Sequence, residues 1–138
     1  MKQIPETENP LVLRTDFSNR AIWEAICKII RGPIAGFHAY VEFVDEAEYA
    51  GLTKVQLLAL IPDNYTHSFI IIADQTAISR PDHPLLIIDL YERSGQEFRA
   101  IPSQIQAIEN NLSIANMDFE EFAEAVDEDG VFRGFPRV

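Results

Sequence analysis

The chain of 138 residues has a single cysteine, few basic side chains and no long apolar run. One cysteine cannot build a disulfide framework, and no stretch reaches the roughly 18 uncharged apolar residues that a membrane-spanning helix needs. Residues 1–10 contain charges and two prolines where a secretion signal would carry an apolar core of about 7–15 residues, so we expect a cytoplasmic protein. The patterns G-x-S-x-G, G-x-G-x-x-G and G-x-x-x-x-G-K-[ST] are also missing, which argues against the usual acyl-transfer and nucleotide-binding sites.

Basic residues are half as numerous as acidic ones: 11 Lys and Arg stand against 22 Asp and Glu, for a net charge of −11. Nucleic acids and anionic membranes bind basic surfaces, so this balance argues against both as partners. The excess is confined to two stretches, 42–48 with four acids and 118–129 with seven, and neither contains a base. The other 11 acids are matched by the 11 bases, so these two stretches account for the whole net charge.

Apolar residues make up 47% of the chain, which predicts a folded protein, and we interpret residues 1–138 as one domain. Two continuous apolar runs rich in Ile are typical of strands that are buried on both faces of a sheet. Three further segments have the composition of strands. The five predicted strands are Leu11–Asp16, 38–45, Ser68–Asp74, Leu85–Tyr91 and Phe98–Ile101.

Start signals precede each of four predicted helices. Ser18 is predicted to cap the first helix, whose apolar residues recur every three or four positions up to Gly32-Pro33. The other three begin with the pattern of a capping box, in which a small polar residue is followed three positions later by Glu or Gln. These pairs are Thr53 with Gln56, Ser103 with Gln106, and Asp118 with Glu121.

The element order is therefore β-α-β-α-β-β-β-α-α. Its alternating first half predicts parallel strands joined by helical crossovers, and the short links of its second half predict antiparallel pairing. We expect an α/β fold, or a mixed α+β arrangement, with a mixed, partly parallel five-stranded sheet and helices on both faces. Residues 1–10 would form an irregular lead-in, Gly130 would end the last helix, and the tail 130–138 would dock through Phe132 and Phe135.

Three aspartates carry the enzymatic hypothesis, because Asp16, Asp45 and Asp74 each end a predicted strand. Parallel strands would bring them to one edge of the sheet, where open α/β sheets bind ligands, and carboxylates there could hold Mg²⁺. The structural alternative is that Asp ends strands and begins turns by bonding nearby backbone N–H groups, and we favour it. Asp89 resembles these three but would lie at the opposite edge, because its strand is predicted to be antiparallel.

The acidic segment from Asp118 carries the binding hypothesis. A helix there would turn acids outward while its apolar residues face the core. Such a field speeds encounter with a basic protein, and an immunity-type inhibitor of a basic nuclease toxin would be an extreme case. The alternative is a solvated face that keeps the protein soluble. The outward acids are Glu120, Glu121, Glu124, Asp127 and Glu128.

No cofactor and no dedicated metal site are predicted, because the three histidines lack ligand spacing and Cys27 is expected to be a buried, inert thiol. In ENNLSIANM, Asn110, Asn111 and Asn116 are interpreted as cap and turn residues, with amide contacts to a ligand as the alternative. Our preferred function is a non-enzymatic acidic binding module that contacts a basic protein, and the alternative is a small Mg²⁺-dependent enzyme.

Several motifs together resemble a known family: RTDFS (14–18), AYVEFVD (39–45), YAGLT with QLLAL (49–60), ENNLSIANMDFEEFA (109–123) and DGVFRGF (129–135). They resemble, over roughly residues 10–135, a family of small bacterial single-domain proteins classed only as a domain of unknown function. The resemblance implies one cytoplasmic domain. It implies no activity, no cofactor and no catalytic residue.

Overall fold

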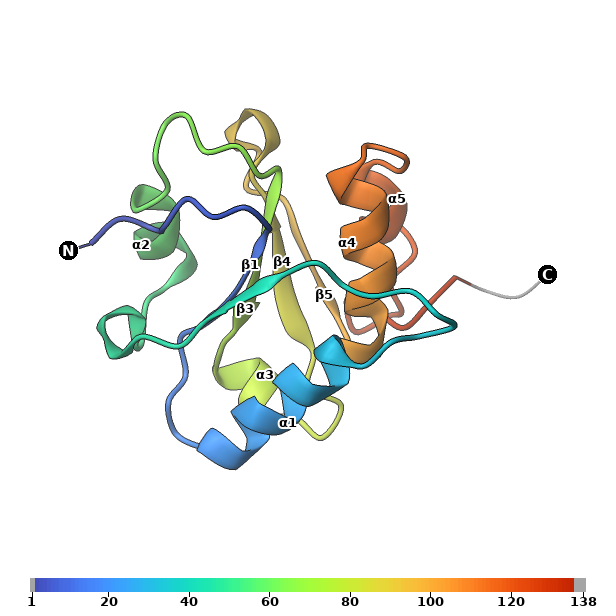
Figure 1. Cartoon of the computed structure of the whole chain (residues 1–138), viewed down its shortest axis with the longest axis horizontal. Coiled ribbons are helices and arrows are strands. Elements are labelled where there is room, and N and C mark those ends of the chain that lie inside the picture. Colours follow the sequence, from blue (N-terminus) through green and yellow to red (C-terminus); the bar gives the residue numbers. More distant parts are fainter. Residues whose placement is uncertain (1, 136–138) are drawn as a thin grey trace.

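A computed structural model describes residues 2–135 and has a mixed β-sheet at its centre (Figure 1). The strands are β1 (Leu11–Arg14), β2 (Glu42–Val44), β3 (Phe69–Ala73), β4 (Leu85–Asp89), β5 (Glu97–Ala100) and β6 (Val131–Phe132). They follow the order β2-β1-β3-β4-β5-β6 across the sheet. β1 is parallel to β2 and β3, β4 is antiparallel to β3 and β5, and β6 is parallel to β5. The expected mixed α/β fold is confirmed, with six strands where five were predicted.

Helices cover both faces of this sheet. They are α1 (Arg20–Arg31), α2 (Lys54–Ala59), α3 (Gln75–Ser79), α4 (Ile105–Ser113) and α5 (Phe119–Ala123), with 3-10 turns at Ala47–Tyr49, Tyr91–Arg93 and Pro102–Gln104. α1, α3, α4 and α5 pack on one face, and α2 packs on the other with the N-terminal segment (Figure 1). None of the helices within residues 2–135 has the length and apolarity to cross a membrane.

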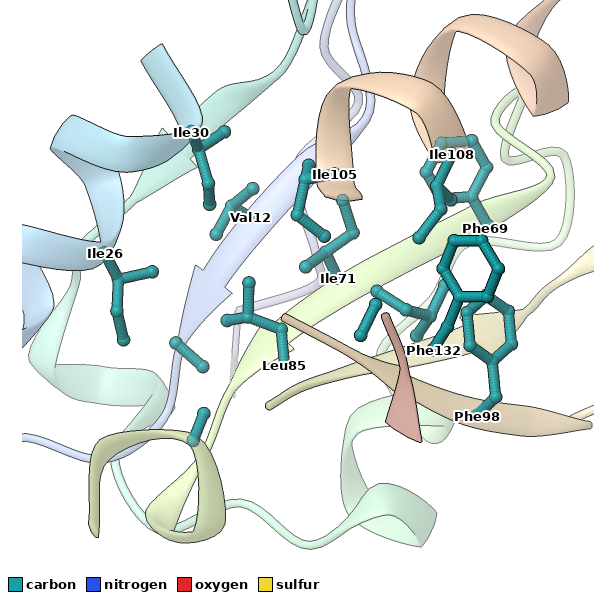
Figure 2. Close-up of a cluster of buried hydrophobic side chains, with 14 of the residues drawn as sticks. Val12, Ile26, Ile30, Phe69, Ile71, Leu85, Phe98, Ile105, Ile108 and Phe132 are labelled. Carbon is teal, nitrogen blue, oxygen red and sulfur yellow. The ribbon is translucent and has the colours of Figure 1, made fainter. Parts of the chain in front are cut away.

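The core has two parts because successive residues of a strand point to opposite faces. In β3, Phe69 and Ile71 point into the larger cluster under α1 and α4, while Ile70 and Ile72 point into the smaller cluster beside α2. Figure 2 shows the larger cluster, in which helical isoleucines meet strand side chains. Continuous apolar runs were therefore a correct sign of strands buried on both faces.

The C-terminal segment contributes the unpredicted sixth strand. Val131 and Phe132 pair with Arg99 and Ala100 of β5, and two residues are too few for a sequence pattern to mark. Phe132 is fully buried, while Phe135 is 47% exposed and lies 5.0 Å from the ring of Phe132, so this part of the tail docks as expected. The rest of the predicted tail, residues 136–138, lies outside the described residues.

α3 was missed because it is only five residues long. The side chain of Asp74 caps it, accepting a hydrogen bond from the amide of Ala77 at 3.2 Å. Its buried residues, Ala77 and Ile78, then join the larger core cluster. A single apolar pair in one helical turn gives no periodicity, so the segment resembled a loop in the sequence.

Of the four predicted helix starts, two capping boxes are confirmed, whereas the N-cap at Ser18 and the capping box of Ser103 with Gln106 are wrong. Thr53 with Gln56, and Asp118 with Glu121, make both reciprocal hydrogen bonds. Asn19 rather than Ser18 caps α1, because its side chain accepts from the amide of Ile22 at 3.1 Å. Instead of a helix capped by the side chain of Ser103 with Gln106, the chain forms the 3-10 turn Pro102–Gln104 before α4, which has no side-chain cap.

Two predicted elements are shorter in the structure. Within the strand predicted at 38–45, the amide of Tyr40 donates to Glu109 of α4 at 2.7 Å, so only 42–44 pair with β1. The last helix ends at Ala123, and Gly130 does not terminate it. Gly130 instead adopts a φ of 82° in a turn that its amide closes on the carbonyl of Asp127 at 2.9 Å. This turn reverses the chain into β6.

The aromatic cluster around Phe122 anchors α5 to the sheet. Phe122 is fully buried, and its ring lies 5.2 Å from that of Phe132 and 6.3 Å from that of Phe98. We expect Phe122→Ala to lower the free energy of unfolding by about 3–5 kcal/mol, because it removes buried surface and leaves a cavity. Urea denaturation measures this loss. Phe37→Ala is the matched control: Phe37 is 61% exposed, and its loss is expected to change stability by no more than about 0.5 kcal/mol. Equal losses in the two variants would contradict this account of the core.

Candidate functional site

The three strand-end aspartates share one edge of the sheet, as expected. β1, β2 and β3 are mutually parallel, and Asp16, Asp45 and Asp74 follow their carboxyl ends. Asp89 ends β4, which is antiparallel to β3, and it lies at the opposite edge. The neighbours of each carboxylate decide what it can do, and these neighbours differ.

Asp45 is held by two arginines. Arg14 is 1% exposed, and its Nη1 donates to Asp45 Oδ1 at 3.0 Å while its guanidinium lies 4.2 Å from the ring centre of Phe17. Arg20 of α1 donates to Asp45 Oδ2 at 3.2 Å. Burial alone would raise the pKa of the Asp45 carboxyl, but the hydrogen bonds and charges of Arg14 and Arg20 hold it below its ordinary value. Asp45 therefore secures the connection after β2 to β1 and α1.

Asp74 forms an ion pair with Arg99 of β5. Arg99 donates from Nη1 to Oδ1 at 3.0 Å and from Nη2 to Oδ2 at 2.7 Å, a two-pronged contact that fixes both groups. The same Oδ1 also caps α3. Asp74 thus joins β3, α3 and β5. Its bond to the amide of Ala77 is of the kind that the structural alternative expected, whereas the pairing with Arg99 was not expected from the sequence.

Asp16 lies at a crevice between β1 and β3. The chain leaves β1 through α1 toward β2, and it leaves β3 through α3 toward β4 on the other side. Open α/β sheets bind ligands where neighbouring strands diverge in this way. The crevice has a volume of about 610 Å³. It is lined by Asp16, Ser18, Asn19, Ile22, Gln75, Ile78, Ser79, Arg80, Pro81 and His83.

Two polar groups of this crevice have defined protonation or pairing. The Nδ1 atom of His83 lies 2.9 Å from the carbonyl of Ala77, and because a carbonyl only accepts, Nδ1 carries a proton. Arg80 is paired with Asp82 at 3.3 Å and with Asp129 at 3.2 Å. The crevice therefore offers the side chains of Asp16 and His83, while the guanidinium of Arg80 is already paired with two aspartates.

The aspartates do not converge on one point. Asp16 alone lines the crevice, since the oxygens of Asp45 and Asp74 accept from arginines. Within residues 2–135, no three His, Cys, Asp or Glu side chains gather closely enough to hold a metal ion. Mg²⁺ needs several oxygen ligands in near-octahedral geometry, so this edge fits it poorly.

The acidic stretch 42–48 is largely neutralised by bases from elsewhere in the chain. Lys2 lies 2.8 Å from Glu46 and 3.4 Å from Glu48, and these contacts raise the pKa of the lysine. Asp45 is paired with arginines, as described, and Glu42 accepts from the amide of Asn9 at 2.8 Å. This stretch contains β2 at one edge of the sheet, whereas α5 contacts β5 near the other edge. The two acidic stretches are therefore separate surfaces.

The acidic stretch 118–129 is neutralised only at its C-terminal end. Arg133 donates to Asp127 and to Asp129, each at 2.8 Å, and also to Asp82 at 2.8 Å. The hydrogen bond from Arg133 is the main reason why the pKa values of Asp129 and Asp82 lie below the ordinary range. Asp127 and Glu128 follow the end of α5 rather than extending its face. No ion pair within residues 2–135 involves Asp118, Glu120, Glu121, Glu124 or Glu128.

These unpaired acids continue into a cleft, which we call the acidic cleft. It has a volume of about 720 Å³ and lies between the loop after β4, the start of β3, and the α4–α5 connection. Four carboxylates line it, and no Lys, Arg or His is present among its described lining residues. The lining residues are Ser68, Asp89, Tyr91, Glu92, Ser94, Gln96, Leu112, Ala115, Met117, Asp118, Phe119 and Glu120.

Sequence reasoning found one side of the acidic cleft and missed the other. Asp118 and Glu120 were predicted in an acidic helix, whereas Tyr91 was predicted only as the last residue of a strand and Glu92 was assigned no role. Asp89 was correctly placed away from the other strand-end aspartates but was not linked to Asp118. The sequence did show that Asp89 is a carboxylate at the end of a buried strand, which is unusual. Its position beside α5 depends on the order of the strands in the sheet, which the sequence pattern does not show.

The asparagines of ENNLSIANM hold the chain together rather than lining the acidic cleft. Asn110 Nδ2 donates to the carbonyl of His38 at 2.9 Å, and Asn116 Nδ2 donates to Asn111 Oδ1 at 2.8 Å. Glu109, only 3% exposed, accepts from the amide of Tyr40. These contacts join α4 to the segment before β2 and shape the turn into α5.

The network of Arg133 with Asp82, Asp127 and Asp129 predicts a stability that depends on pH. Because the folded-state pKa values of Asp82 and Asp129 are lowered, their contribution is complete above the unfolded value of about 3.9. It is lost as the pH falls through the lower folded values. We therefore expect the stability difference between wild type and Arg133→Gln to be largest above about pH 4 and to shrink below it.

Urea unfolding between pH 7 and pH 2 measures this difference. Arg93→Gln is the control, because Arg93 pairs with Asp63, whose side chain is 99% exposed, and such pairs contribute little at any pH. A difference for Arg133→Gln that stays constant across this range would show that the network adds nothing that depends on charge.

Comparison with known proteins assigns the chain to a family but to no activity. A family model described as "Domain of unknown function (DUF6924)" matches residues 9–135. A search among curated proteins found no match. The matched range includes all six strands and all five helices of the structure, in agreement with the resemblance seen in the motifs. The chain therefore belongs to this family, the domain of unknown function DUF6924.

Proposed function

We propose that this protein is a non-enzymatic binding module whose acidic surface contacts a basic protein partner. The surface consists of the acidic cleft and the adjoining exposed acids Glu121, Glu124 and Glu128. One observation carries the proposal: the acids of 42–48 are largely paired with bases, whereas no Lys, Arg or His is among the described lining residues of the cleft and none of the rim acids forms an ion pair within residues 2–135. This is the place where a partner's positive charges would find unpaired carboxylates.

The shape of this surface supports the same function. A flat solvated helix face would serve solubility alone, but here the acids surround a hollow with apolar residues such as Leu112, Met117 and Phe119. Interfaces combine an apolar centre with a charged rim, and complementary charge speeds encounter and suppresses wrong partners. An immunity-type inhibitor of a basic toxin would be a special case of this function.

The setting that we propose is the bacterial cytoplasm. The family resemblance favours bacteria, and the free thiol of Cys27 suits a reducing compartment. Burial raises the pKa of this thiol to about 11, so it stays protonated and unreactive at neutral pH. Cys27 accordingly has no part in the proposed interaction.

Charge reversal on the two acidic stretches tests the proposal. A basic partner would be captured on the immobilised protein at low salt, identified and purified, and its dissociation constant measured at two salt concentrations. We expect Glu120→Lys with Glu124→Lys to weaken binding at least about tenfold, because like charges then face each other. Glu121 is left in place, since it completes the capping box of α5.

The matched control is Glu46→Lys with Glu48→Lys, which reverses the same number of charges beside β2, the outermost strand on the side of the sheet away from α5. We expect it to change the dissociation constant by less than about threefold, because these acids are remote from the acidic cleft. Equal weakening by the two double variants would mean that net charge alone attracts the partner. Binding that resists both added salt and Glu120→Lys with Glu124→Lys would contradict the proposal.

A small Mg²⁺-dependent enzyme is the second candidate, and the crevice at Asp16 is the observation that favours it. The crevice lies where the connections from β1 and β3 diverge, and it combines the carboxylate of Asp16 with the imidazole of His83. Against it stands the pairing of Asp45 and Asp74 with arginines. We therefore place this candidate behind the binding module.

Thermal unfolding with added metal separates the two candidates. We expect 10 mM Mg²⁺ (about the concentration that would reveal a millimolar site) to leave the Tm of the wild type unchanged, because only a ligand that binds the folded state raises it. The Asp16→Asn variant is measured beside it. A Tm increase in wild type that Asp16→Asn removes would favour the enzyme.

A further inference from the structure

The side chain of Asp89 is largely buried in the acidic cleft and has no ion-pair partner among the described residues. Asp89 is the last residue of β4, and alternation along the strand places it on the same face as Leu85 and Ile87, under α4 and α5. The residue is 9% exposed. Buried carboxylates are normally paired, yet no Lys, Arg or His within residues 2–135 lies within ion-pair distance of this one.

One oxygen of this carboxylate is open. Asp89 Oδ1 accepts from the amide of Tyr91 at 3.1 Å, whereas Oδ2 has no hydrogen-bond partner among the described residues. Among the described residues, the hydroxyl of Tyr65 is the only side-chain polar atom that is both shielded from solvent and without a hydrogen-bond partner. Because Oδ2 of Asp89 has no partner and is not such an atom, it must be in contact with solvent. An incoming donor can therefore reach Oδ2 from the acidic cleft.

The walls of the cleft suit a long cation with an apolar stem. Leu112, Met117 and Phe119 offer hydrocarbon surface, and the ring of Tyr91, which is 66% exposed, stands at the rim. Arginine buries its methylene groups along apolar surface, stacks its planar guanidinium on aromatic rings and forks onto carboxylates. A metal ion fits less well, because no three acids within residues 2–135 gather around one point.

We propose that the acidic cleft receives an arginine side chain of the partner, whose guanidinium donates to Asp89 Oδ2 and stacks on Tyr91. The inference rests on the proposed binding function and names the group that is recognised. Glu92, Asp118 and Glu120 surround the entrance and favour a positive charge there. Asp89 thereby gains, in the complex, a cation that no residue within 2–135 supplies in the free protein.

The probe is the capped pentapeptide Gly-Gly-Arg-Gly-Gly, titrated at low salt while the amide and methyl NMR signals of the full-length protein are recorded. Its neutral counterpart carries citrulline in place of arginine. We expect the arginine peptide to shift the Tyr91 amide and the Met117 methyl saturably at millimolar concentration, and the citrulline peptide to leave them unmoved. Ca²⁺ alone is the third titrant and is expected to leave both signals in place.

Asp89→Asn is the decisive variant, because its side-chain oxygen can still accept from the Tyr91 amide while the charge is removed. We expect it to weaken the arginine peptide at least about tenfold, the effect of one charged hydrogen bond. The control is Glu24→Gln, at an exposed acid of α1. It removes one negative charge, as Asp89→Asn does, and should change binding by less than about twofold. Urea unfolding of both variants verifies that they fold.

Three results would overturn the inference: no saturable shift with the arginine peptide, equal binding by Asp89→Asn and wild type, or Ca²⁺ shifting the same signals where the peptide does not. Any of these can occur while the captured partner still responds to Glu120→Lys with Glu124→Lys. In that case the arginine site is wrong and the acidic binding module stands. If the partner ignores those reversals, the proposed function itself fails.

Discussion

The pairing of arginines with aspartates is the constraint on which the rest of the structure depends. Each pair joins segments that are distant in sequence: Arg14 at the end of β1 meets Asp45 after β2, and Arg99 of β5 meets Asp74 at the start of α3. Arg133 ties the segment after β6 to acids of two loops. Pairs that are partly or fully buried need such geometry, because an unpaired charge inside a protein is costly. Arg14, Arg99 and Arg133 are thus engaged in holding the fold together.

This commitment determines which acids remain on the surface. Acids outnumber bases by 22 to 11, and the carboxylates that lack an ion-pair partner among the described residues are not spread evenly. They gather where α5 begins and where β4 ends, around Asp118, Glu120 and Asp89. Two of the three aspartates that suggested catalysis in the sequence, Asp45 and Asp74, are structural partners of arginines, whereas Asp89, which lies away from these three, lines the acidic cleft. We therefore propose that the partner binds at the acidic cleft, where the carboxylates have no basic partners among the described residues.

Elements with a long or repeated pattern were predictable from the sequence, and those specified by tertiary contacts were not. The stripe of α1 and the Ile-rich β3 and β4 were found, because burial on one or both faces leaves a clear pattern. β6 and α3 are too short for any period and form only because β5 and Asp74 hold them. Likewise, Asp118 was visible as a helix start, but its position beside Asp89 depends on a strand order that no local pattern encodes.

The most direct test of the central claim is a map of the amide NMR signals that change when the purified basic partner binds the uniformly labelled protein. We expect changes concentrated in residues 89–96 and 115–124, on both sides of the acidic cleft, with residues 42–48 unaffected. Changes concentrated in 42–48, or around Asp16 and His83 at the carboxyl ends of β1 and β3, would contradict the proposed binding surface.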